Sequence, residues 1–89
     1  MKYLNWNSEK KEILKRERGI SFEEIAYLIE SGQVIGIEEN PGNPNQKIYV
    51  LEIDKYAIIV PCMESDDEIF LKTAFASRKY TKKYVLERE

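Results

Sequence analysis

The stretch KIYVLEIDKYAIIVPCM, residues 47–63, predicts the centre of the fold. Its two halves, 47–53 and 56–63, are rich in β-branched and aromatic residues, which favour strands. Only Asp54 and Lys55 separate them, and so short a connection makes the two strands antiparallel neighbours. The run YAIIV is apolar at every position, which is typical of a central strand covered on both faces.

Further strands are predicted on either side of this hairpin. The segment EIFLKTAF, residues 68–75, follows the turn ESDD and alternates in polarity. The alternation places Ile69, Leu71 and Phe75 in the core and Lys72 on the opposite face. Before the hairpin, QVIGIEE (33–39) favours a strand, and NPGNPNQ (40–46) is dense in loop residues.

The N-terminal third predicts a short edge strand, YLNW at residues 3–6, followed by two helices. The first helix ends at Gly19 in the usual C-terminal manner. The second, at residues 22–30, carries an apolar stripe at helical spacing and ends at Gly32. The capping signals are Asn7 or Ser8 for the first helix, and Ser21 with Glu24 for the second.

A short C-terminal helix is predicted from about Ser77, because SRKYTKKYVLERE has helical composition. The resulting order is strand, two helices, a four-stranded meander and a short helix. We therefore expect one α+β domain, residues 1–89, with the two helices on one face of an antiparallel sheet and the other face uncovered.

Composition excludes several kinds of chemistry. The chain has 89 residues, one cysteine (Cys62) and no histidine, so Cys–His and Ser–His catalysis are excluded and a metal site is not expected. Cys62 lies in an apolar run and is expected in the core. With no apolar run of membrane-spanning length and no N-terminal signal core, we expect a cytoplasmic protein without a cofactor.

Charge is unevenly distributed along the chain. The formal net charge is -2, yet residues 32–67 carry two basic and seven acidic side chains, and residues 68–89 carry six basic and three acidic ones. The segment KTAFASRKYTKKY, residues 72–84, holds five cations and two tyrosines without an acid. A helix with tyrosines packed inward and lysines in water gives the same pattern, so that structural interpretation stays open.

The functional interpretation of this segment is contact with single-stranded RNA. Arg78, Lys72 and Lys47 are predicted around one concave surface, where Arg and Lys attract phosphate. Tyr49, Tyr80 and Tyr84 are candidates for stacking on unpaired bases. RNA cleavage needs no metal, because the ribose 2′-hydroxyl attacks its own phosphate when cations stabilise the charge. The sequence does not decide which residue accepts the proton: a carboxylate such as Glu52, or a lysine or tyrosine whose pKa is shifted.

Two motifs resemble the BrnT toxins of bacterial type II toxin–antitoxin pairs. They are LNWNSEKKEILKRERGISFEE at residues 4–24 and FLKTAFASRKYTKKY at residues 70–84. The resemblance implies a small RelE-like fold, a metal-independent endoribonuclease activity that arrests growth, and neutralisation by a BrnA-like antitoxin that links the pair to DNA. A non-enzymatic RelE-like module that binds RNA or a partner protein is the alternative.

By position, the resemblance implies a catalytic role for Arg78, which matches the family's basic residue after the last strand, and more weakly for Lys72. Arg18 stands where the family usually has a histidine, and arginine does not exchange protons near neutral pH. The predicted catalytic residues are Arg78, Lys72 and Lys47. The predicted RNA-binding residues are Lys79, Tyr80, Lys82, Lys83, Tyr49 and Arg18.

Overall fold

The predicted hairpin is present and forms the middle of the sheet in the computed structural model, which describes residues 3–86. Strands β3 (Asn43–Ile53) and β4 (Tyr56–Glu64) pair antiparallel. The intervening Asp54 and Lys55 have φ values of 53° and 67°. Two positive φ values are what a type I′ hairpin turn requires. This part of the sequence prediction is confirmed.

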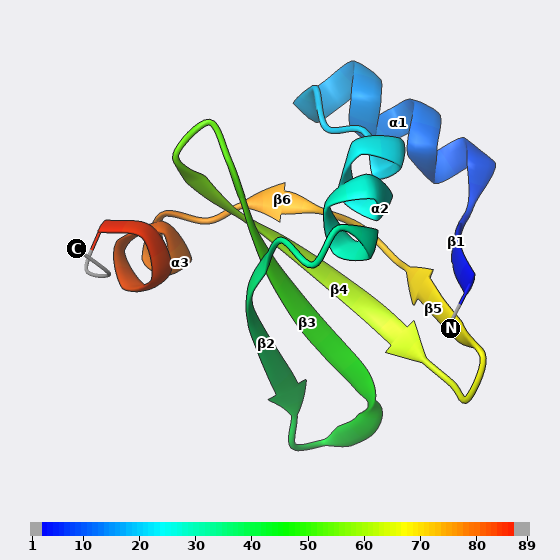
Figure 1. The fold of residues 1–89 in the computed structure, drawn as a ribbon. Helices are drawn as coiled ribbons and strands as arrows, with labels where there is room; N and C mark the ends of the chain where they lie inside the picture. The colour runs from blue at the N-terminus through cyan, green and yellow to red at the C-terminus, as the bar shows by residue number, and fades with distance from the viewer. Residues whose placement is uncertain (1–2, 87–89) are drawn as a thin grey trace.

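The sheet built around this hairpin is mixed (Figure 1). Its strand order is β1-β5-β4-β3-β2, and β6 (Phe75–Ala76) pairs with β4 off that path. At one edge β1 (Tyr3–Trp6) runs parallel to β5 (Glu68–Leu71), while β2 (Val34–Asn40) forms the other edge. The predicted edge strand is confirmed. The predicted four-stranded meander is also confirmed, since β2, β3, β4 and β5 pair antiparallel in chain order. The expectation of an antiparallel sheet was wrong only for β1, because local pattern does not specify the partner of so short a strand.

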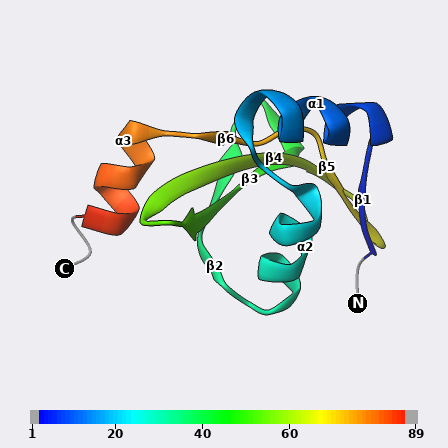
Figure 2. The same cartoon turned by 90° about the horizontal axis from the view of Figure 1, so that it is seen from above.

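Two capped helices, α1 (Ser8–Arg18) and α2 (Phe22–Glu30), cover one face of the sheet (Figures 1 and 2). Asn7 Oδ1 accepts from the Lys10 backbone N–H, and Ser21 Oγ accepts from that of Glu24. Gly19 ends α1 with a φ of 67°. The main core lies between these helices and the sheet and includes Leu14, Phe22, Ile25, Leu51, Val60, Cys62 and Leu71.

The predicted loop at residues 40–46 is shorter than expected, because β3 already begins at Asn43. The β2–β3 register passes from Glu39 opposite Lys47 to Asn40 opposite Asn43, so extra residues of β3 bulge out between these pairs. Pro44 lies in this bulge, where its missing N–H removes no ladder hydrogen bond. A proline-rich sequence is therefore compatible with a strand at this position.

The predicted strand at residues 68–75 is broken into β5 and β6 (Phe75–Ala76). Leu71 pairs with Cys62 and Phe75 with Ile59, so three residues oppose two and form a bulge. The extra residue reverses the alternation. Ala74 is fully buried, whereas Phe75 is 38% exposed. Ile69 and Leu71 are confirmed as core, but the expectation for Phe75 was wrong.

A second core lies on the opposite face of the same sheet. There α3 (Arg78–Thr81) continues into a π-helical turn, η1 (Lys82–Leu86). Val85, with Tyr80 and Tyr84, packs against Val50, Ala57 and Ile59. The second face is therefore partly covered, contrary to the expectation that it would be bare.

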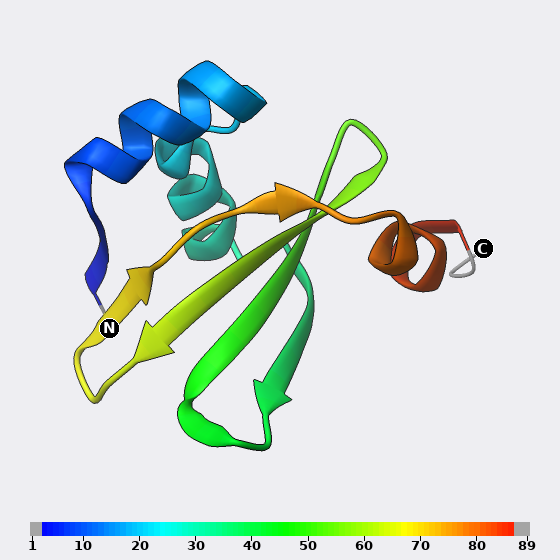
Figure 3. The ribbon, with the colours of Figure 1, turned by 180° about the vertical axis from the view of Figure 1, so that it is seen from behind.

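The remaining part of the second face carries no covering helix within residues 3–86. Figure 3 looks onto this face and shows α3 at one end of it. None of the helices in the described part of the chain is long and apolar enough to cross a membrane.

Candidate functional site

The C-terminal helix is hydrogen-bonded to the start of β4, and these bonds position Arg78. The Ser77 backbone N–H donates to the Ala57 carbonyl at 3.1 Å. Thr81 Oγ1 accepts from the Ala57 N–H at 2.9 Å and donates to the Ser77 carbonyl at 2.6 Å. Ser77 Oγ also caps α3 by accepting from the Tyr80 N–H. The first turn of α3 is therefore fixed beside the β3–β4 turn.

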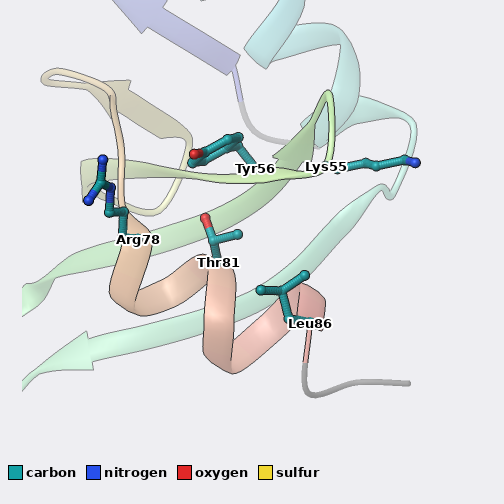
Figure 4. A pocket seen from close by; sticks show the side chains of 5 residues that line it. All are labelled: Lys55, Tyr56, Arg78, Thr81 and Leu86. Carbon is teal, nitrogen blue, oxygen red and sulfur yellow. The ribbon is translucent and has the colours of Figure 1, made fainter.

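A pocket of about 250 Å³ lies between α3 and the start of β4. Lys55, Tyr56, Arg78, Thr81 and Leu86 line it (Figure 4). Tyr56 projects with its hydroxyl toward the side of Arg78, whereas Lys55 extends in the other direction. Tyr56 is 48% exposed and Leu86 is 65% exposed, so the pocket opens directly to solvent.

The charges around the pocket favour an anion. Within residues 3–86, neither Arg78 nor Lys55 forms an ion pair. Lys82 is exposed and follows Arg78 by one helical turn, so both lie on the same side of the helix. No acidic side chain lines the pocket within the described part of the chain. Arginine offers forked donors to phosphate, and Lys82 adds a mobile point charge on the same side of the helix.

Tyr80, Tyr84 and Lys83 hold the C-terminal helix on the sheet through Glu38. Glu38 accepts hydrogen bonds from the hydroxyls of Tyr80 (3.1 Å) and Tyr84 (2.6 Å) and from Lys83 Nζ (3.2 Å). The Tyr84 hydrogen bond is the main cause that lowers the pKa of Glu38 below its ordinary value. The two rings stack with centroids 5.9 Å apart. The two tyrosines are half-buried with their hydroxyls bonded to Glu38, and Lys83 is exposed, as the structural interpretation of the segment expects.

Lys47 and Tyr49 lie away from the pocket, where both contact Glu64. Lys47 Nζ is 2.6 Å from Glu64 Oε2, and the Tyr49 hydroxyl donates to Oε1 at 3.0 Å. Tyr49 is only 6% exposed and belongs to the core under α1 and α2. Its burial raises the pKa of its hydroxyl. Tyr49 is therefore unavailable for base stacking, because its alternation in β3 points it into that core.

Lys72 and Arg18 are also separate from the pocket. The Lys72 backbone N–H bonds to the Pro61 carbonyl, four residues along β4 from Ala57. That separation is about 13 Å along a strand. Arg18 Nη1 donates to the Ala74 carbonyl at 2.8 Å, which ties the end of α1 to the bulge between β5 and β6. The three cations predicted as catalytic are thus not gathered at one point.

Of the remaining predicted contacts, Lys79 and Lys82 are exposed on α3 and η1, and Lys79 Nζ lies 5.9 Å from the Tyr80 ring centroid. Sequence reasoning missed Lys55 and Tyr56 as site residues, since it assigned them only to a turn and a strand. They lie in one pocket with Arg78 only because of the way the last helix packs on the sheet, and the sequence around residues 55 and 56 carries no local signal of that packing.

Neither the single cysteine nor the acidic side chains of the described residues form a further candidate site. Cys62 is buried, and its burial raises the pKa of its thiol to about 12, so it is a core residue. Between residues 3 and 86, no cluster of three or more acidic or cysteine side chains is arranged to hold a metal ion.

Comparisons of the chain with protein-family models, with curated proteins and with solved structures gave no match.

Proposed function

We propose that this protein is the toxin of a type II toxin–antitoxin pair, with a RelE-like fold, and that it cleaves single-stranded RNA without a metal at the pocket beside Arg78. The observation that carries the proposal is the solvent-open pocket, in which Arg78 forms no ion pair within residues 3–86 and lies near the exposed ring of Tyr56. The two motifs that resemble BrnT toxins support it. In this proposal a BrnA-like antitoxin neutralises the toxin and connects it to operator DNA.

The chemistry assigned to the pocket is transfer of the phosphate within the RNA. The ribose 2′-oxygen bonds to phosphorus, the bond from phosphorus to the 5′-oxygen breaks, and the products carry a cyclic phosphate and a 5′-hydroxyl. Arg78 stabilises the negative charge that accumulates on the phosphate oxygens in the transition state.

The proton of the 2′-hydroxyl needs an acceptor, and the 5′-oxygen needs a donor. Glu52 pairs with Ala57 in the β3–β4 register, so its side chain lies on the face of the sheet that α3 partly covers, near the start of β4. Glu52 and the Tyr56 hydroxyl are the two candidate proton carriers.

Other cations extend the RNA path beyond the pocket. In this proposal Lys82 and Lys79 bind phosphates along the helix. Lys72 binds a phosphate further along the sheet, since its backbone partner Pro61 lies about 13 Å along β4 from Ala57, where the C-terminal helix is attached. Lys47 has no part in it, because its ammonium group is paired with Glu64.

A second candidate function is RNA or partner binding without cleavage. The separation of Lys47 and Lys72 from Arg78 favours it, because a single phosphate then meets fewer preorganised cations than a cleavage site gathers.

The test compares Arg78→Ala with Arg16→Ala, an exposed arginine on α1, as the matched control. Purified proteins are incubated with single-stranded RNA, and the product ends are identified. We expect cyclic-phosphate ends from the parent and the control, and a loss of roughly 10²–10³-fold in cleavage rate with Arg78→Ala. Equal rates in both variants would remove Arg78 from catalysis. Binding that depends on Arg78, without any cleavage by the parent, would establish the second candidate instead.

A further inference from the structure

We infer that the pocket beside Arg78 takes one unpaired nucleobase, which stacks on Tyr56 while its phosphate binds Arg78. This inference rests on the proposed function and specifies which part of the RNA the pocket recognises. It makes Tyr56 a specificity-determining residue rather than a further phosphate contact.

The state of the tyrosine hydroxyls distinguishes Tyr56 from the packed tyrosines. Tyr49, Tyr80 and Tyr84 each donate a hydrogen bond to a carboxylate. Tyr56, in contrast, has no hydrogen-bond partner for its hydroxyl within residues 3–86 and is half exposed. Its ring forms no stacked pair with another aromatic residue in the described part of the chain. The face of this ring is therefore available to a ligand.

The lining of the pocket is suited to a flat ring next to an anion. Leu86, the methyl group of Thr81 and the ring of Tyr56 are apolar surfaces, and a bare phosphate gains nothing from them. Of the two cationic residues that line the pocket, Arg78 lies on the side toward which the Tyr56 hydroxyl points, whereas Lys55 extends in the other direction. A nucleotide carries both features, since its base has an apolar face and its phosphate a negative charge.

The size of the pocket limits the ligand to one base. Its volume of about 250 Å³ is below the range of roughly 300–1,000 Å³ found for pockets that enclose a drug-sized ligand. A base that is paired in a duplex has both faces stacked and cannot enter. The pocket therefore selects a single-stranded region or a flexible end.

The experiment measures binding of adenosine 5′-monophosphate and of ribose 5-phosphate by NMR titration of the full chain. The parent is expected to bind the nucleotide roughly tenfold more tightly, because stacking on an aromatic side chain is worth about that factor. Tyr56→Ala should bring the nucleotide to the affinity of ribose 5-phosphate, and Tyr56→Phe should keep the preference. Tyr27→Ala, at a tyrosine of α2 that is 66% exposed, is the control and should change nothing.

The outcomes separate this inference from the proposed function. If the parent binds both ligands equally and still cleaves RNA in an Arg78-dependent manner, the pocket recognises only the sugar phosphate. Only the inference that a base stacks on Tyr56 is then overturned. If the preference survives in Tyr56→Ala, the base lies elsewhere and the inference is again wrong. If RNA is neither bound nor cleaved by the parent, both are wrong.

Discussion

Replacing Gly36 by alanine tests how the last helix is held on the sheet. A Cβ atom at this position of β2 would lie 2.5 Å from Cε1 and 2.8 Å from Cζ of Tyr84. Optimal carbon contacts are about 3.5–4.0 Å, so the ring has to move by roughly 1 Å. The φ of Gly36 is not in the positive range of Gly19 and Gly32, so the backbone itself accepts alanine.

The cost follows from what holds the ring. Tyr84 donates to Glu38 at 2.6 Å and stacks on Tyr80, so its tip is not free to swing away. A hydrogen bond to a charged group is worth about 1.5–3 kcal/mol, and an aromatic pair about 0.5–1.5 kcal/mol. Loss of most of both interactions, offset by about 0.4–1 kcal/mol from the stiffer unfolded chain, leaves a destabilisation of about 2 kcal/mol. For a chain of this size that corresponds to a fall in Tm of roughly 8–16 °C.

Urea unfolding followed by far-UV circular dichroism and by Trp6 fluorescence measures this change. Trp6 stacks on Phe22 in the other core, so agreement between the two probes checks that unfolding is cooperative. Tyr84→Ala removes the obstructing ring, and in that background Gly36→Ala should cost almost nothing. A similar penalty with and without the Tyr84 ring would show that the clash is not the cause. Full stability of the single variant would refute the packing argument altogether.

Two further predictions concern residues whose side chains join separate elements. Glu38→Gln should make the free energy of unfolding less dependent on pH below 4.5. The pKa of Glu38 is lowered in the folded protein, so its stabilising contribution is complete above its ordinary pKa of 4.5 and is lost as pH falls through the lowered pKa. Urea titrations of the variant and the parent from about pH 6 to about pH 3 measure this difference. Arg18→Ala should lower the free energy of unfolding by about 1–2 kcal/mol, because the Ala74 carbonyl loses its donor. RNA cleavage per folded molecule should stay at the parental rate in Arg18→Ala, and a large specific loss would instead restore Arg18 to the RNA-contact residues.

Local signals in the sequence determined most of the elements. Two short-range signals, a two-residue turn between β-rich runs and capping residues ahead of apolar stripes, predicted the hairpin and the two helices because each acts within a few residues. The same reasoning mislocated Phe75, because one extra residue in the bulge between β5 and β6 reverses which side chains face the core. That bulge follows from pairing with β4, which residues 68–75 do not encode by themselves.

The candidate site, too, was only partly predictable from the sequence. The unusual run of cations and tyrosines in residues 72–84 pointed to Arg78 from the sequence alone. Only the tertiary structure separated the tyrosines that pack on Glu38 from Tyr56, which is half exposed, and it brought Tyr56 beside Arg78. The physical reason is that more than twenty residues of chain separate these groups, and they meet only because Ser77 and Thr81 bond to the backbone of Ala57.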